Sequence, residues 1–173
     1  MNPSPIISVL MGSDSDFEVM KEAALILKDF DVKFEMLVTS AHRTPGRTSE
    51  FARNASGRGV KAIIVGAGAA AHLAGVIAAE TTLPVIGVPI NATSLSGLDA
   101  LLSTVQMPGG IPVATMAIGK AGARNAALFA IEILAIHDEI LAEKLKTYRS
   151  RFKASVEEKS SRLQERLDSF LNE

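Results

Sequence analysis

The feature that most constrains the fold is a set of five short apolar runs, each flanked by segments of different composition. The runs are IISVLM (6–11), VKFEMLV (32–38), KAIIVGA (61–67), LPVIGVPI (83–90) and GIPVATMAI (110–118). Strands that are covered on both faces read as nearly uninterrupted apolar sequence, and such strands occur in parallel sheets. The runs therefore predict five strands of a parallel sheet with both faces buried.

Segments with helical character separate and follow these runs. Apolar residues recur at helical spacing in 16–30, and Pro45 suits the first turn of a helix that continues through 46–56. Three further helices are predicted at 71–80, 96–105 and 121–150. This alternation predicts an α/β fold: a three-layer open parallel sheet, flavodoxin-like or Rossmann-like, with right-handed crossovers and a C-terminal helical arm.

The composition changes near residue 143, where Lys, Arg and Glu become frequent. We expect a single α/β catalytic domain over 1–145 and a helical extension over 146–173. Apolar residues from 145 onward fall at steps of three, four or seven, which suits an arm lying on a neighbouring subunit. The alternative is a helix folded back on its own domain. These residues are Leu145, Tyr148, Phe152, Val156, Leu163, Leu167 and Phe170.

Two predicted helices carry too little polar surface for a monomer. The segment 69–80 is apolar nearly all round, and 125–141 has only a thin polar stripe. Because a helix that is apolar on every side must be covered on every side, both segments favour an oligomer.

Composition excludes several classes of protein. The net charge of −1 argues against a nonspecific nucleic-acid binder, and the absence of cysteine excludes disulfides and thiolate catalysis. Residues 62–79 lack charge and have the length of a membrane span, but a glycine turn splits them into a strand-like and a helix-like half. With no signal-peptide pattern at the N-terminus, we expect a cytoplasmic protein that does not bind membranes.

Three loops follow the first three predicted strands and precede helices. They are GSDSD (12–16), SAHRTP (40–45) and GAGAAAH (66–72). Ligands of open α/β sheets bind beyond the carboxyl ends of the strands, and helix N-termini favour anions. The loops therefore predict a site for a small phosphorylated ligand. No Walker loop is present, and GAGAAA matches only half of a dinucleotide fingerprint, which disfavours NAD.

The first loop offers hydroxyls and a carboxylate. Ser13 and Ser15 can donate to phosphate oxygens, whereas an ionised Asp16 only accepts and so suits ribose hydroxyls. The alternative is a plain helix N-cap with no ligand.

The second loop pairs a titratable side chain with a fixed cation. Arg43 offers a planar fork for phosphate or carboxylate, and the imidazole of His42 is of the type that exchanges protons near pH 6.5. The alternative is a surface turn with an incidental histidine. His72 is either a second site residue or a buried histidine bonded to backbone, and His137 is interpreted as structural. Because no two histidines have ligand spacing, no metal site is expected.

The loops MGSDSD and SAHRTP, together with VIGVPI, VQMPGGIPV and the HD pair at 137–138, resemble the class I PurE family. Members of that family are N5-carboxyaminoimidazole ribonucleotide mutases of purine biosynthesis. The resemblance covers residues 6 to 140 in order. One departure is Ala74, where the family commonly has proline at the start of a helix.

The resemblance implies an isomerase that moves a carboxylate from the exocyclic nitrogen N5 to ring carbon C4, without ATP, metal, biotin or any other cofactor. It implies that His42 is the general acid and base. Ser13 and Arg43, helped by Ser40, would hold the phosphate, and Asp16 would bind the ribose. The glycine-rich loop would lie near the migrating carboxyl group, through Gly66, Ala67, Gly68, Ala70 and His72.

The resemblance also implies a homo-octamer with sites between subunits, and a functional link to an ATP-dependent synthetase that supplies N5-carboxyaminoimidazole ribonucleotide. Two other functions stay open. One is the class II enzyme, a carboxylase that takes aminoimidazole ribonucleotide and free CO2. The other is a nucleotide-binding module without catalysis.

Overall fold

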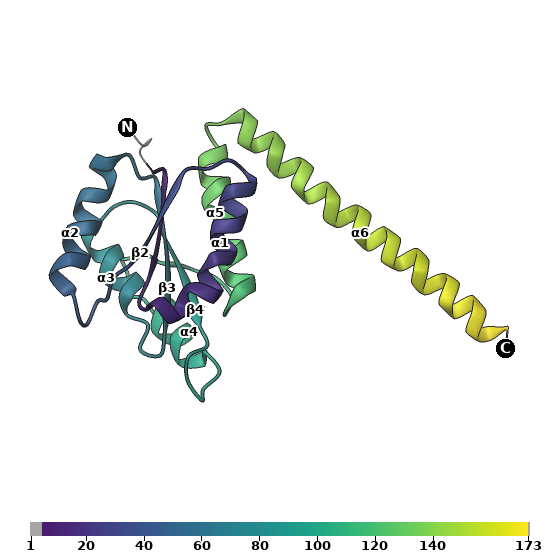
Figure 1. The fold of residues 1–173 in the computed structure, drawn as a ribbon, viewed down its shortest axis with the longest axis horizontal. Helices are drawn as coiled ribbons and strands as arrows, with labels where there is room; N and C mark the ends of the chain where they lie inside the picture. Colours follow the sequence, from purple (N-terminus) through teal and green to yellow (C-terminus); the bar gives the residue numbers. More distant parts are fainter. Residues whose placement is uncertain (1–4, 173) are drawn as a thin grey trace. The chain divides into compact units, whose positions relative to one another are not determined.

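The computed structural model describes residues 5–172 (Figure 1). Five strands, all parallel, form one sheet in the order β2-β1-β3-β4-β5, which is the flavodoxin-like order. The strands are β1 (Ile7–Met11), β2 (Phe34–Val38), β3 (Ala62–Gly68), β4 (Val85–Ile90) and β5 (Ala114–Thr115). The α/β fold predicted from the sequence is therefore confirmed.

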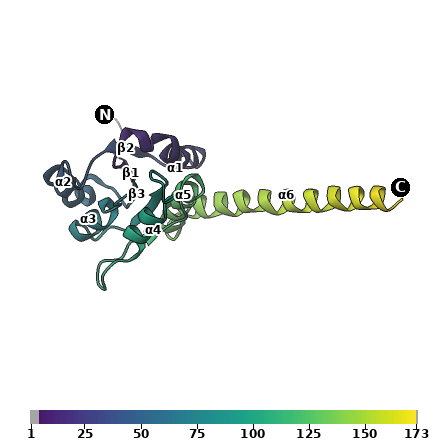
Figure 2. The same cartoon turned by 90° about the horizontal axis from the view of Figure 1, so that it is seen from below.

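Helices cover both faces of the sheet, as the views in Figures 1 and 2 show. The elements are η1 (Asp14–Asp16), α1 (Phe17–Asp29), α2 (Pro45–Ala55), η2 (Ser56–Arg58), α3 (Leu73–Glu80), α4 (Leu98–Val105), α5 (Lys120–Ala135) and α6 (Glu139–Leu171). Of these, α1 and α5 lie together on one face, joined by an ion pair between Glu22 and Arg124 with N···O 2.7 Å. The other face is covered by α2, α3 and α4.

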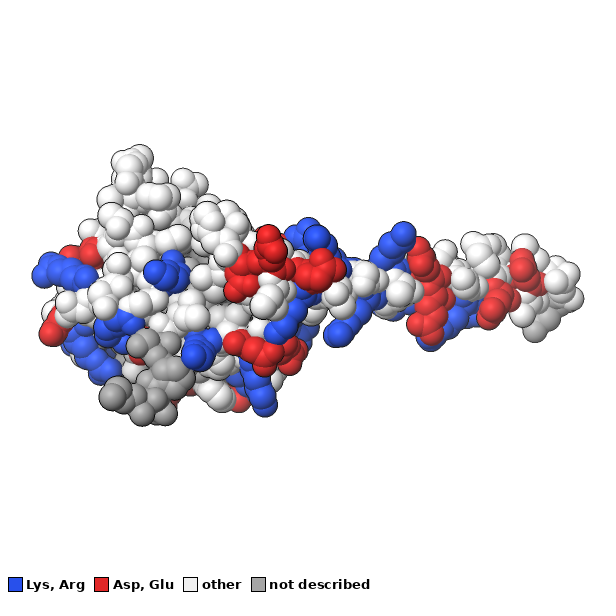
Figure 3. Space-filling view, turned by 90° about the horizontal axis from the view of Figure 1, so that it is seen from above, with Lys and Arg blue, Asp and Glu red and all other residues white. Residues whose placement is uncertain are grey.

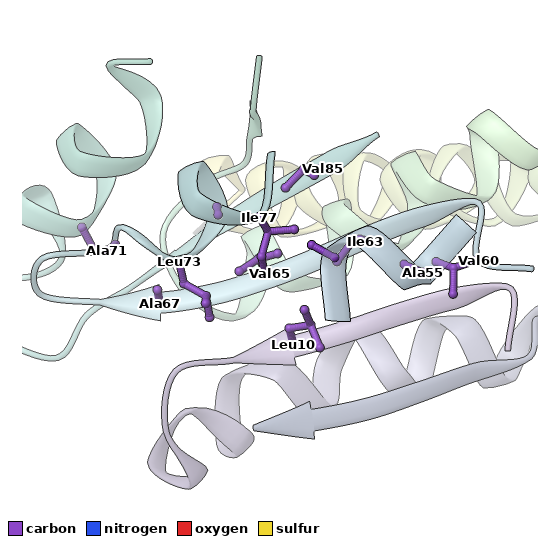
Figure 4. Packing of buried hydrophobic residues seen from close by; sticks show 13 residues of the cluster. Leu10, Ala55, Val60, Ile63, Val65, Ala67, Ala71, Leu73, Ile77 and Val85 are labelled. Carbon is purple, nitrogen blue, oxygen red and sulfur yellow. The ribbon is translucent and has the colours of Figure 1, made fainter. Parts of the chain in front are cut away.

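The core on the α2–α3–α4 face is built from small and β-branched side chains (Figure 4). Ile63 and Val65 of β3 pack with Ala52 of α2 and Ile77 of α3, and all four are buried. Short side chains such as alanine let the helices approach the sheet closely. The buried strands thus hold their loops at fixed positions along one edge of the sheet.

Two elements differ from the sequence-based prediction. The run at 110–118 forms strand only at Ala114–Thr115, since pairing with β4 is limited to Ile86↔Ala114 and Gly87↔Thr115. The helix predicted over 121–150 is interrupted at residues 136–138. Asp138 is extended, and its carboxylate accepts hydrogen bonds from the backbone N–H groups of Ile140 and Leu141, both at 3.0 Å. It therefore caps a new helix, which hydrophobic periodicity alone does not reveal.

The chain divides after Leu134 into two compact units. The second unit contains α6, whose acidic and basic side chains are visible along the helix in Figure 3. Its apolar side chains Phe152, Val156, Leu163 and Phe170 are each more than half exposed. The division into a 1–145 domain and a 146–173 extension stays a prediction, and so does the role of the extension as an arm on another subunit.

Apolar surface agrees with the prediction in one of the two named segments: 125–141 exposes Phe129, Ile136 and Ile140, whereas 69–80 does not expose its large apolar side chains. Leu73, Ala74 and Ile77 of α3 are buried within the first unit, so that helix does not by itself require a neighbour. Instead α4 exposes about half of Leu98 and of Leu102 (52% and 47%). Exposed apolar helix faces of this kind are typical of surfaces that contact another molecule. Within the described part of the chain, none of the helices combines the length and apolar character that a bilayer crossing requires.

Candidate active site

The loops after β1, β2 and β3 meet at the carboxyl edge of the sheet because β1 lies between the other two strands. In the parallel register, Met11 is paired with Val38 on one side and with Gly66 on the other. A hollow of about 400 Å³ lies at this edge. Its lining is formed by Gly12, Ser13, Ser15, Asp16, Ser40, Ala41, His42, Arg43, Ala67, Gly68, Ala69, Ala70 and Ala92.

The β1 loop is a tight capping turn. The Ser13 N–H donates to Asp16 Oδ2 at 3.0 Å, and the Ser15 N–H donates to Ser13 Oγ at 3.3 Å. Ser13 is the N-cap of η1, so the capping role considered from the sequence is confirmed. The same turn places the Ser13 and Ser15 hydroxyls on the wall of the hollow, where a ligand could also reach them.

Asp16 is a buried acidic residue of the site, since only 7% of the residue is exposed to solvent. Burial raises the pKa of its carboxyl above the ordinary value, and Asp14 adds to the increase, while hydrogen bonds from the N–H groups of Ser13 and Gly12 oppose it. The backbone therefore holds the carboxylate in place, although burial removes part of the water that would solvate its charge. An acceptor fixed in this way is suited to bind hydroxyl groups of a ligand.

The β2 loop folds so that its cation reaches the β1 loop. Ser40 Oγ accepts the backbone N–H of Arg43 at 3.1 Å. The Arg43 side chain donates from Nη2 to the carbonyl of Gly12 at 3.3 Å. The guanidinium thus lies beside the Ser13 turn, where hydroxyls, a cation and a helix N-terminus converge on one region that is suited to an anion.

Two histidines from different loops are in direct contact. His42 Nε2 and His72 Nδ1 are 2.9 Å apart, and the rings meet edge to face at 84° with centroids 5.0 Å apart. One nitrogen must donate and the other accept, so the contact requires a proton on one of them and not on the other. His72 is therefore bonded to a side chain and exposed, in contrast to the buried, backbone-bonded alternative considered from the sequence.

Small side chains are required where β3 meets β4. A Cβ added at Gly68 would lie 2.6 Å from the Cβ of Ala92, so only glycine allows this approach. Gly66 lies against Met20 of α1 and is not among the residues that line the hollow. Ala69 adopts φ +53°, a left-handed conformation that is unfavourable for alanine.

The structure brings together most of the residues predicted from the sequence. Ser13, Asp16, Ser40, His42 and Arg43 line the hollow. So do Ala67, Gly68 and Ala70, while His72 contacts His42 from just outside that lining. Sequence reasoning did not name Ala41, Ala69 and Ala92. Ala92 follows β4, so applying the carboxyl-end rule to a fourth loop would have found it.

Comparison with known proteins agrees with this geometry. Residues 6–155 match the model of the family described as AIR carboxylase. The chain is 56% identical over 161 residues to the N5-carboxyaminoimidazole ribonucleotide mutase of Pyrococcus horikoshii, covering 93% of this chain and 90% of the relative. It is 55% identical over 159 residues to the Bacillus subtilis protein of the same name, covering 92% and 98%. The crystal structure of Treponema denticola PurE is similar with a TM-score of 0.82 and 28% identity, covering 92% and 98%.

The raised pKa of Asp16 predicts how its replacement changes stability. The carboxyl binds its proton more tightly in the folded state, so its contribution to stability is fully present below the ordinary pKa of about 3.9 and is lost as the pH rises through the folded pKa. Asp16→Asn keeps an acceptor for the Ser13 N–H without the buried charge. We expect its free energy of unfolding at pH 7 to exceed that of the unmodified chain, with a smaller loss between pH 4 and neutrality.

Urea unfolding at several pH values measures this difference. Glu50→Gln, at an exposed position of α2, serves as the control and should show no such gain. A less stable Asp16→Asn at pH 7 would mean that the carboxylate stabilises the fold.

Proposed function

Because the chain belongs to the AIR carboxylase family, we propose that it interconverts N5-carboxyaminoimidazole ribonucleotide and 4-carboxy-5-aminoimidazole ribonucleotide in purine biosynthesis. It is a mutase, an isomerase that moves a carboxyl group within one molecule. The observation that carries the proposal is His42 beside Arg43 on the lining of the hollow, in a chain that shares half or more of its residues with proteins named for this reaction. The relatives named as mutases favour this activity over a carboxylase that uses free CO2.

His42 moves the proton in the proposed mechanism. As the N–C bond to the carboxyl group breaks and CO2 leaves, an imidazolium proton passes to the exocyclic nitrogen. Ring carbon C4 then attacks the CO2, and the now neutral imidazole removes the C4 proton, which restores the aromatic ring. One group both donates and accepts, so His42 is returned to its starting state after each turnover.

His72 supports this role through its contact with His42. When Nδ1 of His72 accepts this hydrogen bond, His42 carries its proton on Nε2 and its ring is held in one orientation. When the carboxylated ligand enters, its carboxylate can replace His72 as the partner of His42. His72 is then free to bind the migrating carboxyl group.

The remainder of the substrate is bound by the first two loops. Ser13 and Arg43, with Ser40 beside them, hold the phosphate at the N-terminus of η1, and Asp16 accepts hydrogen bonds from the ribose hydroxyls. This binding fixes the heterocycle against the imidazole of His42. Much of the rate then comes from position, since the released CO2 recombines before it diffuses away.

The third loop confines the CO2. Methyl groups and backbone of Ala67, Gly68, Ala69, Ala70 and Ala92 form that side of the hollow, and with substrate bound they would exclude water from the CO2. Gly66 acts indirectly, because its contact with Met20 lets β3 lie close to α1. The reaction involves no net oxidation and no external carboxyl donor, so the proposal calls on no cofactor or metal.

We further propose that the chain acts as a homo-octamer in the cytoplasm, supplied with substrate by an ATP-dependent synthetase. The exposed apolar faces of α4 and α6 support the oligomer. Hydrolysis of ATP by such a partner would provide the energy that the unstable N-carboxylate stores. No role for nucleic acid or membrane is proposed.

Substrate preference tests the proposed activity. With N5-carboxyaminoimidazole ribonucleotide alone, we expect rapid formation of the 4-carboxy product. The absorbance of that product measures the rate. Aminoimidazole ribonucleotide with bicarbonate should react far more slowly at the same enzyme concentration. Turnover only in the second mixture would identify a carboxylase, and binding without turnover in either would identify a nucleotide-binding module.

Two neighbouring substitutions separate proton transfer from binding. We expect His42→Asn to lower kcat by about 10²–10⁴-fold with substrate binding retained, because a general acid and base contributes that much. Arg43→Ala should mainly raise KM, because it loses a phosphate contact that is made equally before and during reaction. Measured kcat and KM for both variants distinguish the roles. If His42→Asn turns over like the unmodified enzyme, the proton is moved by another group.

Phe152, Val156, Leu163 and Phe170 form an exposed apolar stripe on α6, and its replacement tests the proposed oligomer. We expect the double variant Phe152→Asp/Leu163→Asp to lower the mass measured by light scattering below eight times the 18.3 kDa of one chain. The matched control is Ser150→Asp/Ser161→Asp, which adds the same charge on the opposite side of the helix from the stripe. An unchanged mass in the first variant would show that the stripe does not join subunits.

A further inference from the structure

We propose that Thr48, together with Thr39, is a positioning residue that holds the Ser40–Thr44 loop so that His42 faces the substrate. The inference rests on the proposed function, because it assumes that His42 transfers the proton. Neither threonine lines the hollow, and neither was singled out from the sequence. Both are buried, with exposed fractions of 0% for Thr48 and 5% for Thr39.

The Thr48 hydroxyl lies among three oxygens of the loop region. Its Oγ1 is 2.8 Å from Thr39 Oγ1, 3.2 Å from the carbonyl oxygen of Ser40 and 3.1 Å from that of Thr44. A buried threonine in a helix is satisfied by donating to the carbonyl four residues earlier, which here is Thr44. The contacts with Thr39 and Ser40 go beyond what the helix itself needs.

Proton counting allows one direction of this network that connects α2 to the loop. A hydroxyl has one proton to donate and can also accept. When Thr39 donates to Thr48, the proton of Thr48 is free to go to the Ser40 carbonyl. This order satisfies both buried hydroxyls and joins the end of β2 to the loop through the side chain of an α2 residue.

The network fixes the base of the loop at both of its ends. The Thr39 N–H donates to the carbonyl of Met11 at 2.9 Å, which ties this residue to β1. The Ser40 N–H donates to Thr44 Oγ1 at 3.0 Å, and the Ser40 carbonyl accepts from the Thr44 N–H at 3.0 Å. His42 is in the middle of the segment that these bonds close. In the proposal, its position relative to β1 depends on these bonds together with the buried hydroxyl groups of Thr39 and Thr48.

The expected consequence is a rate effect without loss of the fold. Displacement of a reacting group by about 1 Å can lower a rate by about 100-fold. Thr48→Val keeps the side-chain volume and removes the hydroxyl, so we expect kcat to fall about tenfold or more. Thr48→Ser keeps the hydroxyl and loses a buried methyl group, so we expect a lower Tm with kcat within about threefold of the unmodified enzyme.

A double variant separates positioning from stability. Thr39→Val/Thr48→Val removes both hydroxyls, and replacing both partners of a buried hydrogen bond by apolar groups of the same shape is nearly neutral for stability. We therefore expect its Tm to recover relative to Thr48→Val, while kcat stays as low because no hydroxyl of α2 then connects to the Ser40 carbonyl. Recovery of kcat together with Tm would overturn the proposal, as would an unchanged kcat in Thr48→Val.

A matched control comes from another helix. Thr104 of α4 is also buried, with 3% exposure, and donates to the carbonyl four residues earlier, Ala100, at 2.7 Å. We expect Thr104→Val to lower Tm without lowering kcat. If kcat follows Tm across all four variants, the threonines are structural only. Failure of the unmodified enzyme to interconvert the two ribonucleotides would instead refute the proposed function.

Discussion

The position of β1 between β2 and β3 is the constraint on which the site depends. Hydrogen bonding in the parallel sheet sets neighbouring strands about 4.8 Å apart, so the loops that leave their carboxyl ends must begin side by side. The pairing of Met11 with Val38 and with Gly66 aligns those ends. Three loops of quite different sequence therefore share one hollow, although residues 12 and 72 are far apart in the chain. The buried apolar core provides the stability that holds this alignment.

Two features of the site oppose stability while they favour binding. The carboxyl of Asp16 is buried with a raised pKa, and Ala69 has a left-handed backbone. Strain and desolvation of this kind persist where the surrounding structure holds them in place, and they are concentrated at functional sites. Here the sheet lies beneath the loops, and the backbone N–H of Ser13 holds the Asp16 carboxylate.

The predictability of each element follows from how local its cause is. Strands β1 to β4 are continuous apolar runs, so their existence follows from composition. By contrast, β5 depends on which residues reach β4, and it is shorter than the run at 110–118 because only Ala114 and Thr115 pair there. The break before α6 depends on one carboxylate, that of Asp138, turning back to cap Ile140 and Leu141. A periodic apolar pattern continues through both features and cannot reveal them.

The sequence by itself determined the class of fold, the three loops of the site and the chemical character of Ser13, Asp16, His42 and Arg43, because these depend on apolar runs and on side-chain type. Only the tertiary structure decided that His42 contacts His72, that Gly66 packs against Met20 instead of lining the hollow, and that Ala92 and the buried Thr39–Thr48 pair adjoin the site. The physical reason is that such contacts join residues from separate strands and helices. Their distances are set by sheet register and helix packing, which no local stretch of sequence contains.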